Sequence, residues 1–244
     1  MNRSLRTGQE RNGEHIIIDD FFRFPHTPHI KWLGPSEPRG DKLLSDEEAA
    51  EMLSFSLTVE EKVDGANVGF SVGSHGRLRA QNRGAWIEHD AGGQFKHLWQ
   101  WARRYEYDLI ERLGRNLILF GEWCYAQHSI HYRTLPDWFI GFDIYDQSTN
   151  QFYSVDRRNE LLASLGIPVI KPMARGVFSE PRLEEFLEKP SSYDAEKLEG
   201  VYLRQDESDF LLRRAKLVRS DFTQTIGEHW SRKRIIPNQI FFIE

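Results

Sequence analysis

A lysine followed two residues later by an aspartate and then a glycine is the first pattern in the chain that could do chemistry. It stands in Glu61-Lys62-Val63-Asp64-Gly65, where a β-rich run typical of a strand ends. The amine of Lys62 would then lie at a strand end beside a carboxylate, and a deprotonated lysine is a nitrogen nucleophile. A hairpin turn with a surface ion pair is the alternative, so the pattern needs partners elsewhere in the chain.

Further charged and aromatic residues follow in order, each within or at the end of a predicted strand. They stand in the segments Arg83-Gly84, Phe120-Gly121-Glu122, Phe142-Asp143-Ile144, Glu199-Gly200 and Arg214-Ala215-Lys216. Together with EKVDGAN, the segments GEW, GFDIYD, EGVYLR and RAKLVR resemble, in this order, the motifs of the covalent nucleotidyltransferase superfamily of RNA ligases, DNA ligases and mRNA capping enzymes. The resemblance runs from Val59 to Arg219, and the ordered set is more specific than any one of its motifs.

The resemblance implies that Lys62 attacks the α-phosphorus of ATP, takes AMP as a phosphoramidate and releases pyrophosphate. The pKa of a lysine is ordinarily about 10.4, so its amine is a weak nucleophile at neutral pH. Burial, bound magnesium and the cations Lys216 and Arg83 would lower this pKa, whereas Asp64 would raise it. We expect the metal and the crowding of positive charge to decide the outcome.

Four more roles are implied by the same resemblance. Glu122 would accept hydrogen bonds from a ribose hydroxyl, with a surface acid on an edge strand as the alternative. Phe142 would stack on the purine, with plain core packing as the alternative. Glu199 would hold Mg²⁺ through water, and Asp64 would serve the metal-linked steps.

The remaining motif residues are implied to bind the nucleotide or the RNA. Lys216 would contact the α-phosphate, and Arg83 the 5′-phosphate of the accepting strand. Asn67 would be a polar neighbour of the nucleophile, and the backbone of Glu61 would contact the adenine amine. Family members often carry lysine at both ends of K-x-K in the last motif, whereas this chain has Arg214. A guanidinium keeps the charge but not the compact ammonium, which leaves the role of Arg214 in nucleotide binding open.

The end of the sequence bears on which member of the superfamily this is. Of the 244 residues, only 28 follow Lys216, too few for the OB barrel that DNA ligases and capping enzymes carry after the last motif. RNA ligases of the RNA ligase 2 type do not need that domain for the first step. The segments FPHTPH, GEWCYAQHSIHY and RIIPNQ also look like their compact bacterial and phage-type relatives.

We therefore expect an ATP-dependent RNA ligase that uses Mg²⁺, or Mn²⁺ in its place, and joins 3′-hydroxyl and 5′-phosphate RNA ends. Two alternatives stay open. One is a DNA ligase-like adenylyltransferase, and the other is a non-catalytic nucleotide- or RNA-binding module of the same fold.

The composition excludes other classes of protein. A formal net charge of −5 argues against a surface coated in positive charge for unspecific nucleic-acid binding. The single cysteine, Cys124, excludes a disulfide framework and a cysteine-built zinc site. The apolar runs are too short to cross a bilayer, and the first residues lack the apolar stretch of a secretory signal. A cytoplasmic protein without a membrane partner is expected; a monomer is expected too, although the sequence does not establish the oligomeric state.

Two histidine pairs offer another kind of metal site. His26 and His29, and likewise His128 and His131, are each three residues apart. Prolines interrupt the first pair, and neither pair has a companion acid at a suitable distance, so we expect loop or core histidines.

The elements that must position these residues are those of one α+β domain with mainly antiparallel sheets, flanking helices and no C-terminal OB domain. Ser45 and Glu48 form a capping-box pattern, which predicts that a helix begins there. Residues 94–114 have apolar residues at helical spacing, which predicts one long helix ended by Gly114. Residues 1–44 are assigned to an N-terminal extension that is partly loop, and residues 45–244 to the nucleotidyltransferase domain.

The remaining elements are predicted from periodicity and from glycine and proline punctuation. Helices are expected at residues 155–166, 181–189 and 221–230, and strands at 57–65, 66–74, 77–84, 116–126, 138–146, 199–205 and 209–219.

Overall fold

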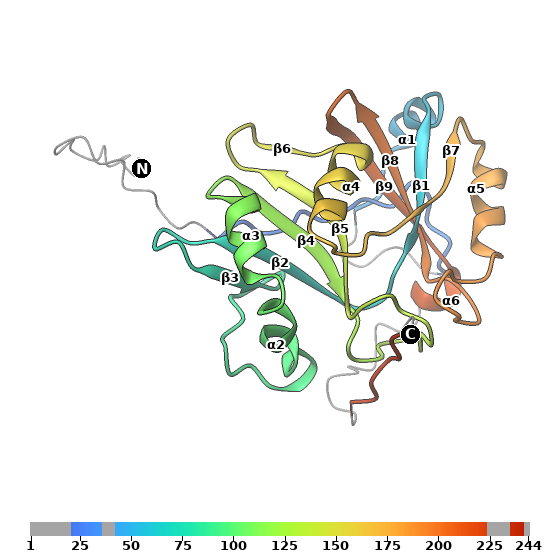
Figure 1. Ribbon diagram of the computed structural model, residues 1–244. Coiled ribbons are helices and arrows are strands. Elements are labelled where there is room, and N and C mark those ends of the chain that lie inside the picture. Colours follow the sequence, from blue (N-terminus) through green and yellow to red (C-terminus); the bar gives the residue numbers. More distant parts are fainter. Residues whose placement is uncertain (1–20, 36–41, 224–234, 242–244) are drawn as a thin grey trace, which may run out of the picture.

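Two antiparallel sheets make up the framework of the protein (Figure 1). The computed structural model describes residues 21–35, 42–223 and 235–241. One sheet has the strand order β7-β1-β8-β9 and the other the order β3-β2-β4-β5-β6. The strands are β1 (Leu57–Lys62), β2 (Ala66–Val72), β3 (Leu78–Gln81), β4 (Leu117–Trp123), β5 (Phe139–Asp146), β6 (Gln151–Phe152), β7 (Pro172–Gly176), β8 (Gly200–Glu207) and β9 (Phe210–Val218). The predicted α+β fold with mainly antiparallel sheets is confirmed.

The four-stranded sheet has one apolar and one charged face, because alternate residues of a strand point to opposite sides. Its outer face buries aliphatic side chains such as Val59 and Leu203 under α1 (Asp46–Leu53) and α5 (Glu180–Leu187). The inner face carries polar and charged side chains, namely Glu60, Lys62, Tyr202, Arg204, Arg214 and Lys216. This polar face meets the five-stranded sheet through ion pairs, among them Arg204 to Asp143 on β5 at 2.8 Å.

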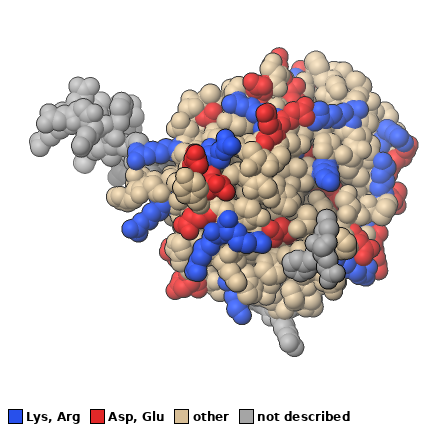
Figure 2. Space-filling model, viewed as in Figure 1, with Lys and Arg blue, Asp and Glu red and all other residues tan. Residues whose placement is uncertain are grey.

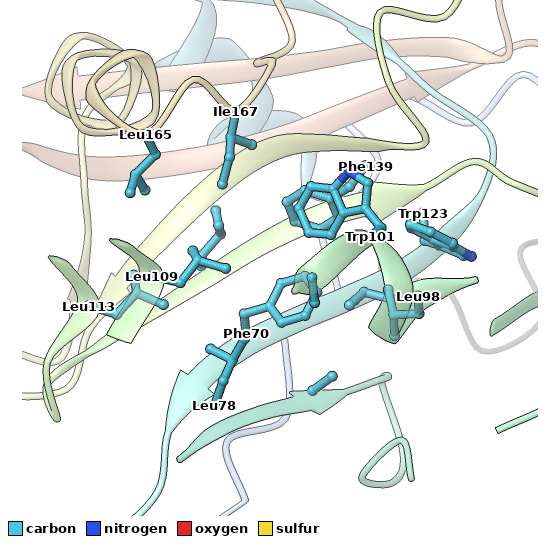
Figure 3. Close-up of a cluster of buried hydrophobic side chains, with 14 of the residues drawn as sticks. Phe70, Leu78, Leu98, Trp101, Leu109, Leu113, Trp123, Phe139, Leu165 and Ile167 are labelled. Carbon is cyan, nitrogen blue, oxygen red and sulfur yellow. The ribbon is translucent and has the colours of Figure 1, made fainter. Parts of the chain in front are cut away.

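The five-stranded sheet is apolar on both faces. Its outer face packs against α2 (Leu98–Ala102) and α3 (Glu106–Leu113), with Phe70, Trp101 and Phe139 at the centre (Figure 3). Its inner face carries Phe120, Ile140 and Phe142. The site described below lies where this inner face approaches the charged face of the other sheet.

Residues 21–35 precede the first helix and pack into the domain. The ring of Phe24 lies edge-on to Phe120 at 4.9 Å and to Phe142 at 5.4 Å between centroids. Backbone bonds then join the segment to β9, since Ile30 donates to the carbonyl of Lys216 at 2.9 Å. Apart from isolated bridges at His29, the described part of this segment has no regular secondary structure.

The single helix predicted over residues 94–114 is wrong. The structure has a short 3₁₀ turn at Gly93–Phe95 and then α2 and α3 as separate helices. Tight i+3 bonds close the turn between them, where Tyr105 donates to the carbonyl of Ala102 at 2.9 Å. The break has a packing reason: α2 buries four of its five residues, whereas α3 buries only Leu109 and Leu113 along one side. A straight helix could not present both surfaces to the same sheet.

Other local predictions are confirmed. Ser45 and Glu48 form the predicted capping box at the start of α1. The predicted helix after Ser154 is α4 (Val155–Ser164). Only the start of the helix predicted at 221–230 is seen, as α6 (Ser220–Thr223), because the remainder lies outside the described residues.

Surface charge and hydropathy agree with the composition. On the face drawn in Figure 2, lysines and arginines are interspersed with aspartates and glutamates rather than gathered in one basic surface. Among the described residues, no helix combines the length and the hydropathy that crossing a membrane requires.

Candidate active site

Lys62 and Glu199 form the centre of the candidate site. Lys62 is the last residue of β1, and its register partner on β8 is Gly200, so Glu199 stands directly beside it. The Nζ atom of Lys62 lies 2.5 Å from Oε2 of Glu199, with both side chains less than a fifth exposed. A Cβ atom at Gly200 would lie 2.3 Å from the carbonyl oxygen of Leu217, so only glycine lets β8 approach β9 this closely.

A cavity of about 180 Å³ opens over this pair. Four of the residues singled out from the sequence line it: Lys62, Arg83, Glu199 and Lys216. They come from β1, the loop after β3, the residue before β8, and β9, so the two sheets together bring them into one place.

The cavity also has walls that were not predicted to bind the nucleotide. They are His26, Thr27, His29, Tyr202, Val218 and Phe222. Tyr202 had a usable signal, since it lies two residues from Arg204 on the same charged face of β8. His26 and His29 stand out in the sequence only as a spaced pair, for which loop or core histidines are expected. A loop residue reaches this position only through the path of the chain.

The pKa of Lys62 is governed by two opposing effects. Removal from water lowers the pKa of Lys62, but the negative charges of Glu199 and Glu122 and the hydroxyl of Tyr202 outweigh it and raise the pKa above its ordinary value. The protein's own groups therefore hold Lys62 as an ammonium. Burial acts in the expected direction, but the expectation that the pKa would be lowered overall is wrong for the protein alone, because Glu199, Tyr202 and Glu122 together outweigh burial.

Glu122 and Asn67 lie opposite each other on β4 and β2. Removal from water raises the pKa of Glu122 to about 7, against the opposing charges of Lys62 and Arg83. The side-chain amide of Asn67 is buried and has no hydrogen-bond partner within the described part of the chain. A buried carboxamide without a partner is rare, and beside a carboxyl it indicates a place for a polar ligand.

Asp64 is hydrogen-bonded to a neighbouring loop and does not line the cavity. Its Oδ2 atom accepts hydrogen bonds from the backbone N–H groups of Ser129 at 2.6 Å and Ile130 at 3.1 Å. Its own N–H donates to the hydroxyl of Tyr132 at 2.8 Å. Asp64 is still near enough for its charge to raise the pKa of Glu199, after the larger effect of burial.

Gly65 explains why the turn after Lys62 can pass so close to β4. A Cβ atom at Gly65 would lie 2.8 Å from the carbonyl oxygen of Trp123 and 3.0 Å from Cγ of Glu122. A larger residue would push Asp64 and Lys62 away from Glu122.

Five residues predicted to bind the nucleotide do not line this cavity. Asn67 and Glu122 are described above, and the other three are Phe142, Glu61 and Arg214. Phe142 is 7% exposed, where β5 has one residue more than β4, and it packs against Phe24. Glu61 accepts from the hydroxyl of Ser191 at 2.5 Å on the outer face of β1, and burial raises its pKa. The stacking predicted for Phe142 and the backbone contact predicted for Glu61 stay predictions.

Arg214 is the third, and it points into the interior between the sheets. Its guanidinium lies 2.5 Å from Oδ2 of Asp143 and 3.9 Å from the ring centroid of Phe152. The neighbouring Arg204 binds the other oxygen of the same carboxylate. The geometry thus gives Arg214 the task of joining the sheets, while Lys216, two residues on, faces the cavity.

For a divalent cation, the described residues of the site offer carboxylate ligands but not a complete set of protein ligands. In residues 21–35, 42–223 and 235–241 no group of three or more histidines, cysteines or acids is arranged to hold a metal ion. Glu199 and Asp64 nevertheless place two carboxylates close together, and magnesium needs only one or two because it keeps most of its water. The donor set fits a hydrated Mg²⁺ or Mn²⁺. Of the histidines, His128 has its Nε2 atom 2.8 Å from Oε1 of Gln94 and its Nδ1 atom 3.9 Å from Oδ1 of Asp64.

Comparison with known proteins gives three findings. The sequence model of the RNA ligase family matches residues 56–218. A search of curated proteins found no match to the sequence. Solved structures with the same fold include those of an RNA ligase from Naegleria gruberi.

Two of these structures cover 84% of this chain at a TM-score of 0.58, an apo variant at 17% identity and a variant with ATP and Mn at 18%. A third, with pyrophosphate, covers 72% at 22% identity and a TM-score of 0.55. At such identities the likeness shows the fold alone. The matched part spans only 53 to 58% of the length of the Naegleria protein.

Proposed function

This chain belongs to the RNA ligase family, and on that premise we propose that it is an ATP-dependent RNA ligase that joins 3′-hydroxyl and 5′-phosphate ends. The observation that carries the proposal is the convergence of Lys62, Arg83, Glu199 and Lys216, from four separate segments, around one cavity. A nucleophile, a carboxylate and two cations at one place suit phosphoryl transfer, which depends mainly on positioning and charge.

In the first step Nζ of Lys62 attacks the α-phosphorus of ATP. A P–N bond forms, the bond to the β-phosphate oxygen breaks, and pyrophosphate leaves with its electron pair. Lys62 must first lose the proton that Glu199 and Glu122 stabilise. Lys216 lies across the cavity, where its ammonium would neutralise the charge that develops on the α-phosphate.

Glu199 and Asp64 would hold the divalent cation. When bound, the cation supplies positive charge that offsets these carboxylates, lowers the pKa of Lys62 and neutralises the triphosphate. Asn67 and Glu122 lie beside Lys62 with the polar groups that a ribose hydroxyl requires.

Two further displacements complete the reaction. An oxygen of the RNA 5′-phosphate, held by Arg83, attacks the phosphorus of lysyl-AMP; the P–N bond breaks and Lys62 regains its proton. The 3′-hydroxyl of the second RNA end then attacks the 5′-phosphorus, loses its proton, and AMP leaves. Each step is an in-line displacement in which the protein supplies orientation and charge.

The proposal is tested by covalent labelling. Incubation with ATP labelled in the α-phosphate and Mg²⁺ should label the protein, and Lys62→Ala should lose the label. Lys171→Ala, at an exposed lysine on the surface, is the matched control and should label as the wild type does. Labelling that persists in Lys62→Ala would show that another residue is the nucleophile. Sealing of all-RNA but not all-DNA nicks by the labelled protein would separate an RNA ligase from a DNA-adenylating enzyme.

A further inference from the structure

A second cavity, of about 320 Å³, lies at one edge of the five-stranded sheet. This edge is β3, the terminal strand of the order β3-β2-β4-β5-β6 (Figure 1). The cavity lies between β3, the loop that follows it and the first turn of α2, and it shares no residue with the cavity over Lys62.

Flat groups wall this second cavity in two stacked pairs. The guanidinium of Arg79 lies 4.4 Å from the ring centroid of Trp86. The ring of His89 stacks on Trp99 with centroids 3.7 Å apart and planes inclined by 26°. The indole N–H of Trp99 donates to the carbonyl of Glu88 at 2.8 Å, which holds that ring in place. Trp99 is buried and His89 is exposed, so His89 is the ring of this pair that faces the solvent.

The charges around the cavity are mainly positive. Arg77 and Arg79 line it, and among the described residues the only carboxylate in its lining is that of Glu88. Planar aromatic rings beside arginines are the features with which proteins bind single-stranded nucleic acids: the rings stack on bases and the guanidinium groups contact phosphates. None of the steps proposed at the first cavity uses a residue of the second cavity.

The loop after β3 connects the two cavities. Asn82 begins the loop, and its side-chain oxygen accepts hydrogen bonds from the N–H groups of Gly84 at 2.8 Å and Ala85 at 2.9 Å. This turn directs Arg83 toward Lys62 and Trp86 toward the second cavity. Trp86 stands three positions after Arg83. The Cα atoms of these two residues are therefore at most about 11 Å apart, the length of three residues of extended chain. A stacked strand rises roughly 3.4 Å per nucleotide, so the distance corresponds to about three nucleotides.

We propose that the second cavity binds a base of the 5′-phosphorylated RNA strand, within about three nucleotides of the end that Arg83 holds. The base stacks between the Trp86 and His89 walls while Arg77 contacts the backbone. This inference rests on the proposed function, but it concerns RNA binding and not the formation of lysyl-AMP.

The test measures binding of a 5′-phosphorylated single-stranded RNA of about ten nucleotides by fluorescence anisotropy. Trp86→Ala should bind roughly tenfold more weakly than the wild type, since a stacking platform is lost. Its labelling by ATP should stay at the wild-type level. Tyr107→Ala, at an aromatic residue that is 78% exposed on α3, is the matched control and should bind normally. Normal binding by Trp86→Ala would overturn the inference.

Position along the RNA gives a second measurement. Abasic substitutions at each of the first five nucleotides should weaken binding most at one of the first three, and in Trp86→Ala that position should lose its effect. Equal sensitivity of the wild type and Trp86→Ala at every position would contradict the inference.

Arg77→Ala keeps the inference testable if Trp86→Ala does not fold. It should weaken RNA binding and reduce the salt slope by about one, whereas Arg112→Ala, at an exposed arginine on α3, should not. An unchanged slope in Arg77→Ala would count against the inference. A wild-type protein that ATP does not label would instead contradict the proposed function, whatever the RNA measurements show.

Discussion

Two groups of charges lie on or against the inner face of the four-stranded sheet, and they differ in how they are paired. One is the ionic network of Glu60, Asp143, Arg158, Arg204 and Arg214, and the other is the group around Lys62. In the network, Arg158 is fully buried and binds both oxygens of Glu60, at 2.6 and 3.2 Å. Arg204 and Arg214 each take one oxygen of Asp143.

Around Lys62 the pKa values and the hydrogen bonding differ from those of the network. Lys62 has a raised pKa, Glu122 has its pKa raised to about 7, and the amide of Asn67 has no partner within the described residues. Asp143, by contrast, keeps a lowered pKa although burial opposes it, because its arginines overcome the loss of water. Each charge that joins the sheets thus has an oppositely charged partner, while charges that would handle a ligand are left with pKa values that a ligand can change.

The largest expected effect separates nucleophile from charge. Lys62→Arg keeps a cation beside Glu199 but replaces the amine with a guanidinium that does not deprotonate in proteins. Labelling by ATP should fall to the background of the assay, while the free energy of unfolding, from urea titration, stays within about 1 kcal/mol of wild type. A labelled Lys62→Arg protein would contradict the role of Lys62.

The network should respond in the opposite way. Arg158→Met removes the guanidinium that binds both oxygens of Glu60 and leaves that carboxylate, among the described cations, only Arg204, whose Nε is 3.9 Å away, so the free energy of unfolding should fall by about 3 to 5 kcal/mol. The control is Arg175→Ala, which breaks an exposed pair with Asp156 and should cost less than about 1 kcal/mol. Equal losses in the two variants would show that the buried pair does not join the sheets as described.

The raised pKa of Glu122 makes stability depend on pH. An unfolded glutamate loses its proton near 4.5, whereas Glu122 in the folded protein keeps it up to about 7. The folded state therefore binds more protons in this window, so the contribution of Glu122 to stability falls as the pH rises from about 4.5 to about 7 and is constant above.

Glu122→Gln removes this dependence. The unfolding free energy of the variant should rise relative to wild type by at most about 3 kcal/mol across the window, from about 1.4 kcal/mol per pKa unit. The measurement is a series of urea titrations between these pH values. Parallel curves for the two proteins would show that the pKa of Glu122 is not raised.

The smallest expected effect concerns two of the three basic residues of β9, Arg214 and Lys216. Arg214→Lys should lower stability by about 1 to 2 kcal/mol, because the guanidinium that bridges Asp143 and the aromatic rings is lost. It should keep most of the labelling by ATP. Lys216→Arg should do the reverse and reduce labelling with little change in stability. If Arg214→Lys abolishes labelling, Arg214 acts on the nucleotide and not between the sheets.

Much of the fold and of the site was predictable because the signals are local. The capping box at Ser45 depends on residues three apart, and each strand is marked by its own residue types. Lys62, Glu199 and Lys216 stand at strand ends or within strands, where motif order alone indicated that they act together. The helix predicted over 94–114 failed because its break depends on how α2 and α3 fit one sheet, which no local spacing records.

The sequence by itself determined which side chains can do chemistry and in which order they follow along the chain. Only the tertiary structure decided that Lys62 is surrounded by acids, that Arg214 turns inward while Lys216 faces the cavity, and that His26 and Thr27 form a wall. Motif residues are specified by their types and near neighbours. Charge balance, burial and cavities depend on which distant segments meet, and that is settled by the packing of one sheet against the other.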